Sequence, residues 1–268
     1  MLTRPSRRDS GHTQPIASPL KPALSEFSPI HLQSPSMTPA RIAELLAPFI
    51  GEYEQRDAPA LFPAISTYID ILLRWNSRIN LTAIREPEQI VTRHFGESLF
   101  LARNLFVGTD ATCCPGGRSP ATAEAGVALA DLGSGAGFPG IPIKLWVPPI
   151  SLTLIESNHK KSAFLQEITR FLTLTDVNIK NARAETIPPA AFDVVTLRAV
   201  ERFEAILPIA ARLLKPQGRL ALLIGTAQLS EARSLLPNHD FSEPLPIPLS
   251  TSRVLLLGQP CHSGQEPR

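Results

Sequence analysis

Apolar residues between positions 38 and 106 recur every three or four positions, which is the spacing of one face of a helix. A Thr38-Pro39 pair precedes the first such stretch, and this order is typical of a helix start because a hydroxyl caps the first turn and proline fits there. Similar faces run from about residue 60 to 75 and from Pro87 onward. The pattern predicts a small helical cap over residues 37–107.

From Val127 onward, short apolar runs alternate with helical stretches. The predicted strands are residues 127–131, 151–156, 177–180, 192–197, 219–224 and 253–257, and the predicted helices are 160–172, 204–214 and 228–236. Strands that alternate with helices favour a mostly parallel sheet with helices on both faces. We therefore expect an α/β domain over residues 127–260.

Three segments do not fit either pattern. Residues 1–36 are rich in proline and serine and carry more arginine than acid, so we expect a disordered tail or a start codon misplaced upstream of Met37, with a targeting peptide as the alternative. Residues 108–126 predict a loop insertion, and residues 261–268 a second tail.

Composition narrows the function only slightly. The chain has a net charge of +2 and a pI near 8.5, which is compatible with nucleic acid but does not require it. No run of 18 apolar residues occurs, so no membrane span is expected. The three cysteines lack metal-ligand spacing, which predicts no metal site and favours a reducing, cytoplasmic setting. No feature specifies an oligomeric state.

The segment 131–140 reads DLGSGAGFPG and lies between a predicted strand and a predicted helix. Gly133, Gly135 and Gly137 let the backbone pass close to a ligand, although a glycine-rich loop alone also fits a tight turn. Glu156 ends the next strand, where an acid can accept hydrogen bonds from both ribose hydroxyls of an adenosine. The loop and the acid together predict an adenosine-containing cofactor.

Asp131 helps to decide which cofactor this is. Its carboxylate would repel the pyrophosphate of a dinucleotide but could bind the ammonium of an amino acid. S-adenosyl-L-methionine carries an ammonium and no phosphate. The charge pattern therefore favours a methyl donor over the dinucleotide of an oxidoreductase.

Several motifs together resemble the RsmG (GidB) family of bacterial small-subunit rRNA methyltransferases: Trp75-Asn76, Asn80-Leu81-Thr82, Arg93-His94 and DLGSGAGFPGIP at 131–142. The resemblance implies a Rossmann-like class I S-adenosylmethionine-dependent methyltransferase fold with an N-terminal helical cap. It also implies N7-methylation of a guanine in a decoding-region loop of 16S rRNA, as free rRNA or in the small ribosomal subunit.

The resemblance further implies cofactor contacts at Gly133, Phe138, Ala184, Glu185 and Arg198. Arg198 follows a central strand, where a fixed planar cation could pair with the methionine carboxylate. Three positions depart from the usual family residues: Glu97 replaces aspartate, Leu197 replaces serine and Ile224 replaces lysine. We expect contacts with RNA phosphates from Arg74, Arg78, Arg85, Arg93, His94, Lys160 and Lys161. The alternative is that these residues lie on solvated helix faces.

Guanine N7 has a free lone pair and no proton, so its methylation requires no general base, and no catalytic residue is nominated. Two alternatives remain open at this point. One is a methyltransferase of the same fold that acts on another RNA or on a non-RNA substrate. The other is a non-catalytic nucleic-acid-binding module that uses the helical cap.

Overall fold

The computed structural model describes residues 37–51, 60–106, 126–198 and 202–261. The tail predicted for residues 1–36, nearly all of the predicted insertion and most of the predicted second tail lie outside the described residues. Within the described ranges, no helix is both long and apolar enough to cross a membrane.

The first half of the described chain is helical, as predicted. Thr38 caps the first helix because its hydroxyl accepts a hydrogen bond from the Arg41 N–H at 3.3 Å. The predicted helix that begins at Pro87 is interrupted by a π-helical segment, a feature often found near functional sites. The elements are α1 (Pro39–Ile50), α2 (Leu61–Asn76), α3 (Pro87–Gln89), the π-helix η3 (Ile90–Gly96) and α4 (Glu97–Phe106).

The second half forms an eight-stranded sheet in the order β3-β2-β1-β4-β5-β8-β6, with β7 also paired to β8. The first five of these strands are parallel, and β8 is antiparallel to β5, which confirms the predicted mostly parallel sheet. The strands are β1 (Ala128–Leu132), β2 (Ser151–Ile155), β3 (Val177–Lys180), β4 (Phe192–Arg198), β5 (Leu214–Gly225), β6 (His239–Phe241), β7 (Leu245–Pro246) and β8 (Arg253–Pro260).

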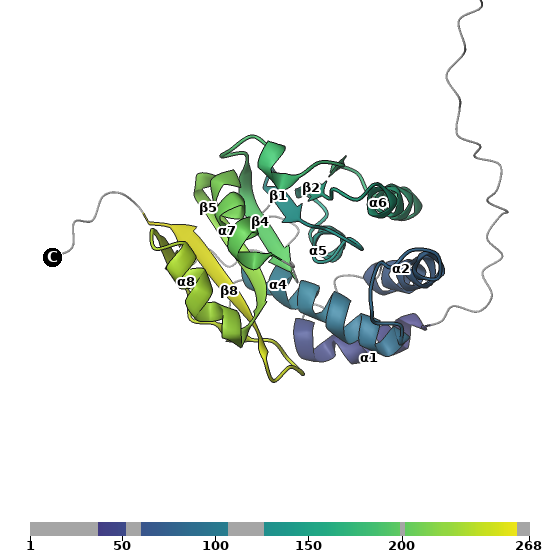
Figure 1. The fold of residues 1–268 in the computed structure, drawn as a ribbon. Helices are drawn as coiled ribbons and strands as arrows, with labels where there is room; N and C mark the ends of the chain where they lie inside the picture. Colours follow the sequence, from purple (N-terminus) through teal and green to yellow (C-terminus); the bar gives the residue numbers. More distant parts are fainter. Residues whose placement is uncertain (1–36, 52–59, 107–125, 199–201, 262–268) are drawn as a thin grey trace, which may run out of the picture. The chain divides into compact units, whose positions relative to one another are not determined.

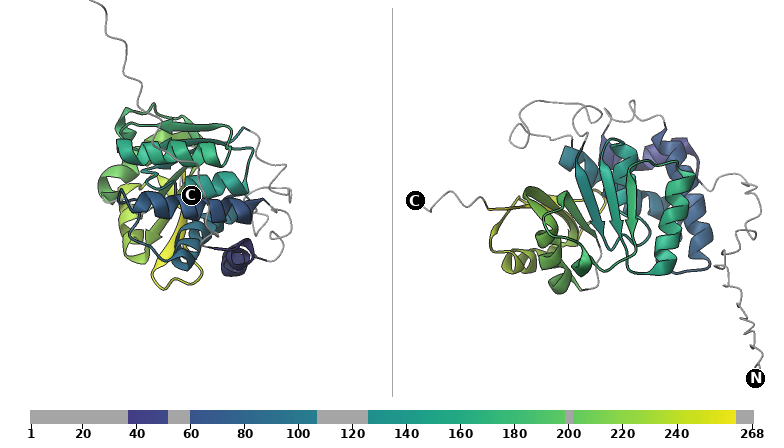
Figure 2. Two further views of the ribbon diagram at one scale, coloured as in Figure 1. Left: turned by 90° about the vertical axis from the view of Figure 1, so that its right-hand side faces the viewer. Right: turned by 90° about the horizontal axis from the view of Figure 1, so that it is seen from above.

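Alternate residues of the strands supply two separate cores, one on each face of the sheet. Leu129, Val194 and Leu255 face the core shared with the cap, α5 (Gly140–Trp146) and α6 (His159–Phe171). Ala130, Val195 and the other strand residues of opposite parity face α7 (Phe203–Leu213) and α8 (Leu229–Leu235). Figures 1 and 2 show α2, α5 and α6 on one side of the sheet and α7 and α8 on the other.

The strand order places β1 between β2 and β4, where the winding of the sheet reverses direction. Leu132 at the end of β1 pairs with Ile155 of β2 and with Leu197 of β4, so all three strands end at one edge. Ligands of open α/β sheets bind beyond the carboxyl ends of the strands at this reversal. The glycine-rich segment after β1 therefore lies where a ligand is expected.

Candidate cofactor-binding site

Three glycines shape the loop after β1, and all have left-handed backbone conformations, with φ of 67° at Gly133, 55° at Gly135 and 85° at Gly137. A Cβ on Gly137 would lie 2.6 Å from Ile141 Cδ1 and closer still to the Tyr68 hydroxyl. Among the described residues, a Cβ on Gly135 would meet only the Gly133 carbonyl oxygen, at 3.7 Å, so these residues leave open space above this glycine. The loop is packed beneath Gly137 and open above Gly135.

Glu156 lies directly against this loop. One carboxylate oxygen accepts the Gly135 N–H at 2.9 Å, and the other accepts the Asn158 N–H at 2.8 Å. Each carboxylate oxygen has a second lone pair that these bonds leave available. The structure thus brings together the acid and the glycine loop that the sequence pattern paired.

Asp131 is fully buried and is bonded to protein groups. Its carboxylate accepts the Gly140 N–H at 3.1 Å and the Thr196 hydroxyl at 3.0 Å. Burial raises the pKa of this carboxyl to about 7, while the two hydrogen bonds act in the opposite direction. Asp131 therefore holds the start of α5 against β4, and its contact with a ligand ammonium stays a prediction.

An aromatic stack joins the loop to the cap. The Phe138 ring stacks on Tyr68 of α2, with centroids 5.4 Å apart, and on His94 of η3, with centroids 4.7 Å apart. The Tyr68 hydroxyl donates to the Ala136 carbonyl at 2.6 Å. The role of Tyr68 was not predicted, because a tyrosine on an apolar helix face carries no signal of what its hydroxyl reaches.

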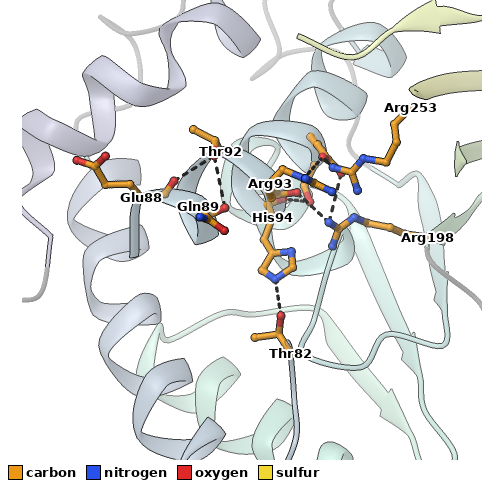
Figure 3. Close-up of polar contacts among 10 residues, drawn as sticks. Thr82, Glu88, Gln89, Thr92, Arg93, His94, Arg198 and Arg253 are labelled. Carbon is orange, nitrogen blue, oxygen red and sulfur yellow. Dashed lines mark hydrogen bonds and ion pairs between the residues drawn. The ribbon is translucent and has the colours of Figure 1, made fainter. Parts of the chain in front are cut away.

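The short polar motifs of the cap form one internal network behind this stack. The Asn76 side chain accepts the N–H groups of Leu81 and Thr82 at 2.9 and 3.0 Å and donates to the Thr82 carbonyl at 2.9 Å. Thr82 Oγ1 and His94 Nε2 share a hydrogen bond of 2.8 Å (Figure 3). The network fixes the His94 ring, which stacks on Phe138. Burial, with the nearby Arg198 cation, lowers the pKa of His94 to about 3, so this ring is neutral.

Arg198 ends β4 and turns toward the cap (Figure 3). Its Nη2 donates to the Arg93 carbonyl at 2.8 Å and to Glu97 Oε2 at 3.3 Å, and the side chain is only 9% exposed. Glu97 also pairs with Arg93, at 3.3 Å, and with Nη2 of Arg253. From the sequence we expected Arg198 to meet a ligand carboxylate, and the structure shows a protein carboxylate bound to part of its guanidinium.

The other predicted contacts, Ala184 and Glu185, lie on the 3-10 turn η4 (Ala184–Thr186) that follows β3. Arg212 of α7 fixes this turn by donating to the carbonyls of Glu185 and Ile187, both at 3.1 Å. Because β3 pairs with β2, the turn lies on the edge of the sheet where Glu156 lies. Contact of Ala184 and Glu185 with a cofactor stays a prediction.

The two departures on the central strands are apolar and buried. Leu197 has no exposed surface and Ile224 is 4% exposed, and both belong to the core shared with α7 and α8. They therefore complete the packing on that face. In the ranges that the structure covers, no group of three or more histidine, cysteine or acidic residues could hold a metal ion.

Comparison with known proteins agrees with the family resemblance of the sequence motifs. Residues 62–242 match the family model described as rRNA small subunit methyltransferase G. The chain is 37% identical over 190 residues to the "Ribosomal RNA small subunit methyltransferase G" of Xylella fastidiosa strain 9a5c, covering 69% of this chain and 80% of that protein. The protein of the same name from Xanthomonas campestris pv. campestris strain B100 is 37% identical over 169 residues, or 63% and 71% of the two chains.

Among solved structures, a ribosomal protein L11 methylase from Lactobacillus delbrueckii subsp. bulgaricus superposes with a TM-score of 0.47 and 16% identity. That match covers 62% of this chain and 80% of the other.

Proposed function

The chain belongs to the rRNA small subunit methyltransferase G family, and on this premise we propose that it methylates N7 of a guanine in a decoding-region loop of 16S rRNA with S-adenosyl-L-methionine as the donor. The observation that carries the proposal is the pairing of Gly135 with Glu156 at the point where the sheet reverses direction. In this proposal residues 127–260 form the methyltransferase domain and residues 37–107 form a cap on it.

The residues at this edge fit the proposed donor. The space above Gly135 accommodates an approaching ligand, and Glu156 has lone pairs free for ribose hydroxyls. Arg198 has an Nε–H with no hydrogen-bond partner among the described residues, which suits the carboxylate of the methionine part. Asp131 beside the loop disfavours a pyrophosphate and hence a dinucleotide, whereas an acid at the position of Glu156 suits the ribose of either cofactor.

When bound, S-adenosyl-L-methionine supplies an electrophilic methyl group on a positively charged sulfur. The residues of the chain bind and orient the donor and the target base, and they exclude water. Guanine N7 offers a lone pair without a proton, so no side chain has to act as a base, and a pKa of about 3 makes the buried His94 a weak base. Positioning of two reactants in line supplies about 7–11 kcal/mol in favourable cases.

The proposed partner is 16S rRNA, either free or within the small ribosomal subunit, and action on it places the chain in the cytoplasm. The target guanine must be accessible, which favours a loop base or a base flipped out of its stack.

Two experiments test the proposal separately. Calorimetry with the purified chain should show binding of S-adenosyl-L-methionine and none of NADH, and the reverse result would indicate an oxidoreductase. Deletion of the coding sequence should remove 7-methylguanosine from the small-subunit rRNA. If the modification persists in the deletion strain, another enzyme is responsible and this chain acts on a different substrate.

A further inference from the structure

Among the described residues, four charged side chains meet between the cap and the sheet, and their charges do not balance. Glu97 is 2% exposed and pairs with Arg93 of η3, Arg198 of β4 and Arg253 of β8. Figure 3 shows the side chains of these three arginines close together. Three guanidinium groups around one carboxylate leave this arginine cluster with a net charge of +2. Asp131, which also attracts Arg198, has a pKa of about 7 and so supplies only part of a compensating charge at neutral pH.

The cluster also has unused hydrogen-bonding capacity. Among the described residues, Arg198 Nε, Arg253 Nε and His94 Nδ1 are buried and have no hydrogen-bond partner. Arg198 is 9% exposed and His94 is 7% exposed, so water is largely excluded from both. Buried polar groups are costly when they have no partner, and buried positive charges more so. Both facts point to an anionic ligand that accepts hydrogen bonds.

The three arginines form a gradient from the interior to the solvent. Arg198 is 9% exposed, Arg253 is 22% exposed and Arg93 is 48% exposed. Strand pairing explains why the two sheet residues are neighbours. Arg198 pairs with Leu223 of β5, and Gly225, two residues further along β5, pairs with Arg253 at the start of β8. The cluster therefore lies at the edge of the sheet that carries the proposed cofactor site, with its outer side open.

We propose that Arg93 and Arg253, supported by Arg198, form a binding site for a phosphodiester group of the RNA substrate. The identity of that RNA rests on the proposed function. Guanidinium groups bind phosphate oxygens with paired N–H donors, and a phosphodiester carries one negative charge. An oxyanion on a long polymer reaches the exposed rim of Arg93 and Arg253 directly from solvent. This phosphate contact anchors the RNA beside the proposed cofactor site, where the target base is methylated.

A second source of an oxyanion is the methionine carboxylate of the donor, which Arg198 is expected to bind. The net charge of +2 accommodates both anions, one at the buried end of the cluster and one at its rim. The two sources differ in a measurable way. Phosphate contacts with RNA release counterions and so depend on salt concentration, whereas binding of the small donor is measured without RNA.

The test uses the full chain and a fluorescently labelled transcript of small-subunit rRNA, with binding measured by anisotropy over a range of KCl concentrations. Variants Arg93→Gln and Arg253→Gln should each bind the transcript several-fold more weakly. The slope of log affinity against log salt should fall by about 0.7–0.9 for each phosphate that is no longer neutralised. Arg93→Lys, which retains the charge, should keep most of the slope. Affinity for S-adenosyl-L-methionine, measured by calorimetry, should be unchanged in Arg93→Gln and Arg253→Gln.

Arg233→Gln is the matched control, because Arg233 is an exposed arginine on α8, which packs on the opposite face of the sheet. An unchanged salt slope in both glutamine variants would overturn the proposal. So would a loss of donor affinity with unchanged RNA binding, since the anion would then be the methionine carboxylate. Thermal unfolding of each variant identifies damage to the fold, and Arg93, being half exposed, decides the result if Arg253→Gln does not fold.

Methyl transfer by the unmodified chain separates this inference from the proposed function. If the unmodified chain methylates small-subunit rRNA while both glutamine variants retain its salt slope, only the phosphate site is wrong. If the unmodified chain does not methylate this RNA, the proposed function itself fails.

Discussion

The carboxylate of Glu156 accepts a hydrogen bond from the N–H of Gly135 over 2.9 Å, which joins the end of β2 to the loop that follows β1. This contact fixes Gly135 at the point where the described residues leave open space above the loop, since an added Cβ there would meet only the Gly133 carbonyl oxygen among them. It also holds a carboxylate beside that space, where we propose that the adenosine of the donor binds.

Replacement of Glu156 by alanine should weaken binding of S-adenosyl-L-methionine. Each hydrogen bond to a charged acceptor contributes about 1.5–3 kcal/mol, so the loss of one ribose contact alone corresponds to roughly 10- to 100-fold in Kd, and the loss of both contacts to a larger effect. Calorimetry measures this directly. Glu243→Ala removes an exposed acid outside the site and should leave the affinity unchanged. Equal affinity of Glu156→Ala and the unmodified chain would show that the ribose does not bind at this acid.

Gly137→Ala should destabilise the fold by about 2–5 kcal/mol, because a left-handed backbone strain adds to overpacking. The Tyr68 hydroxyl cannot move aside easily, since Tyr68 is fully buried and bonded to the Ala136 carbonyl. Gly126→Ala provides the matched control, because Gly126 also has a positive φ, of 102°, but no atom of the described part of the chain lies within 4 Å of its added Cβ. Urea unfolding of the two variants should differ by about 1–3 kcal/mol, and equal losses would contradict the packing argument.

The stability of the chain should depend on the protonation of Asp131. Its pKa is about 7 in the folded chain and about 3.9 in an unfolded one, so between these values the folded state holds a proton that the unfolded state has released. The contribution of Asp131 to the free energy of unfolding therefore falls as pH rises from about 4 to about 7 and is constant above that range. Relative to Asp131→Asn, the free energy of unfolding of the unmodified chain should decrease over this interval. A difference that does not vary with pH would show that Asp131 is ionised throughout.

His94 should remain neutral down to about pH 4. Burial and the neighbouring Arg198, Arg253 and Arg93 all lower its pKa, to about 3. Heteronuclear NMR of the ring nitrogens should show no titration of His94 between pH 5 and 8, whereas an exposed histidine titrates near about 6.5. A midpoint near about 6.5 for this ring would mean that the stack on Phe138 opens to solvent.

Local patterns predicted the elements well where periodicity is strong. The helices of the cap, the parallel strands and the glycine loop beside Glu156 follow from spacing alone. The strands β6 and β7 were missed, since three and two residues are too few to show alternation. The π-helical turn at Ile90–Gly96 was also missed, because its apolar spacing resembles that of an α-helix.

Side-chain roles that depend on burial could not be predicted from the sequence. Asp131 was assigned to a ligand from its position, but whether it faces the ligand or the protein depends on Gly140 and Thr196, which only the fold brings together. The arginine cluster is a further example. Arg93, Arg198 and Arg253 are far apart in the chain and meet at Glu97 through the pairing of β4, β5 and β8 and the packing of the cap.

Transfer of a labelled methyl group tests the central claim most directly. Small ribosomal subunits from the deletion strain are incubated with the purified chain and S-adenosyl-L-methionine that carries a deuterated methyl group, and the rRNA is then digested to nucleosides for mass spectrometry. We expect the label in 7-methylguanosine of the 16S rRNA. Label in another nucleoside, or no label in RNA when the chain binds the donor, would contradict the proposed activity.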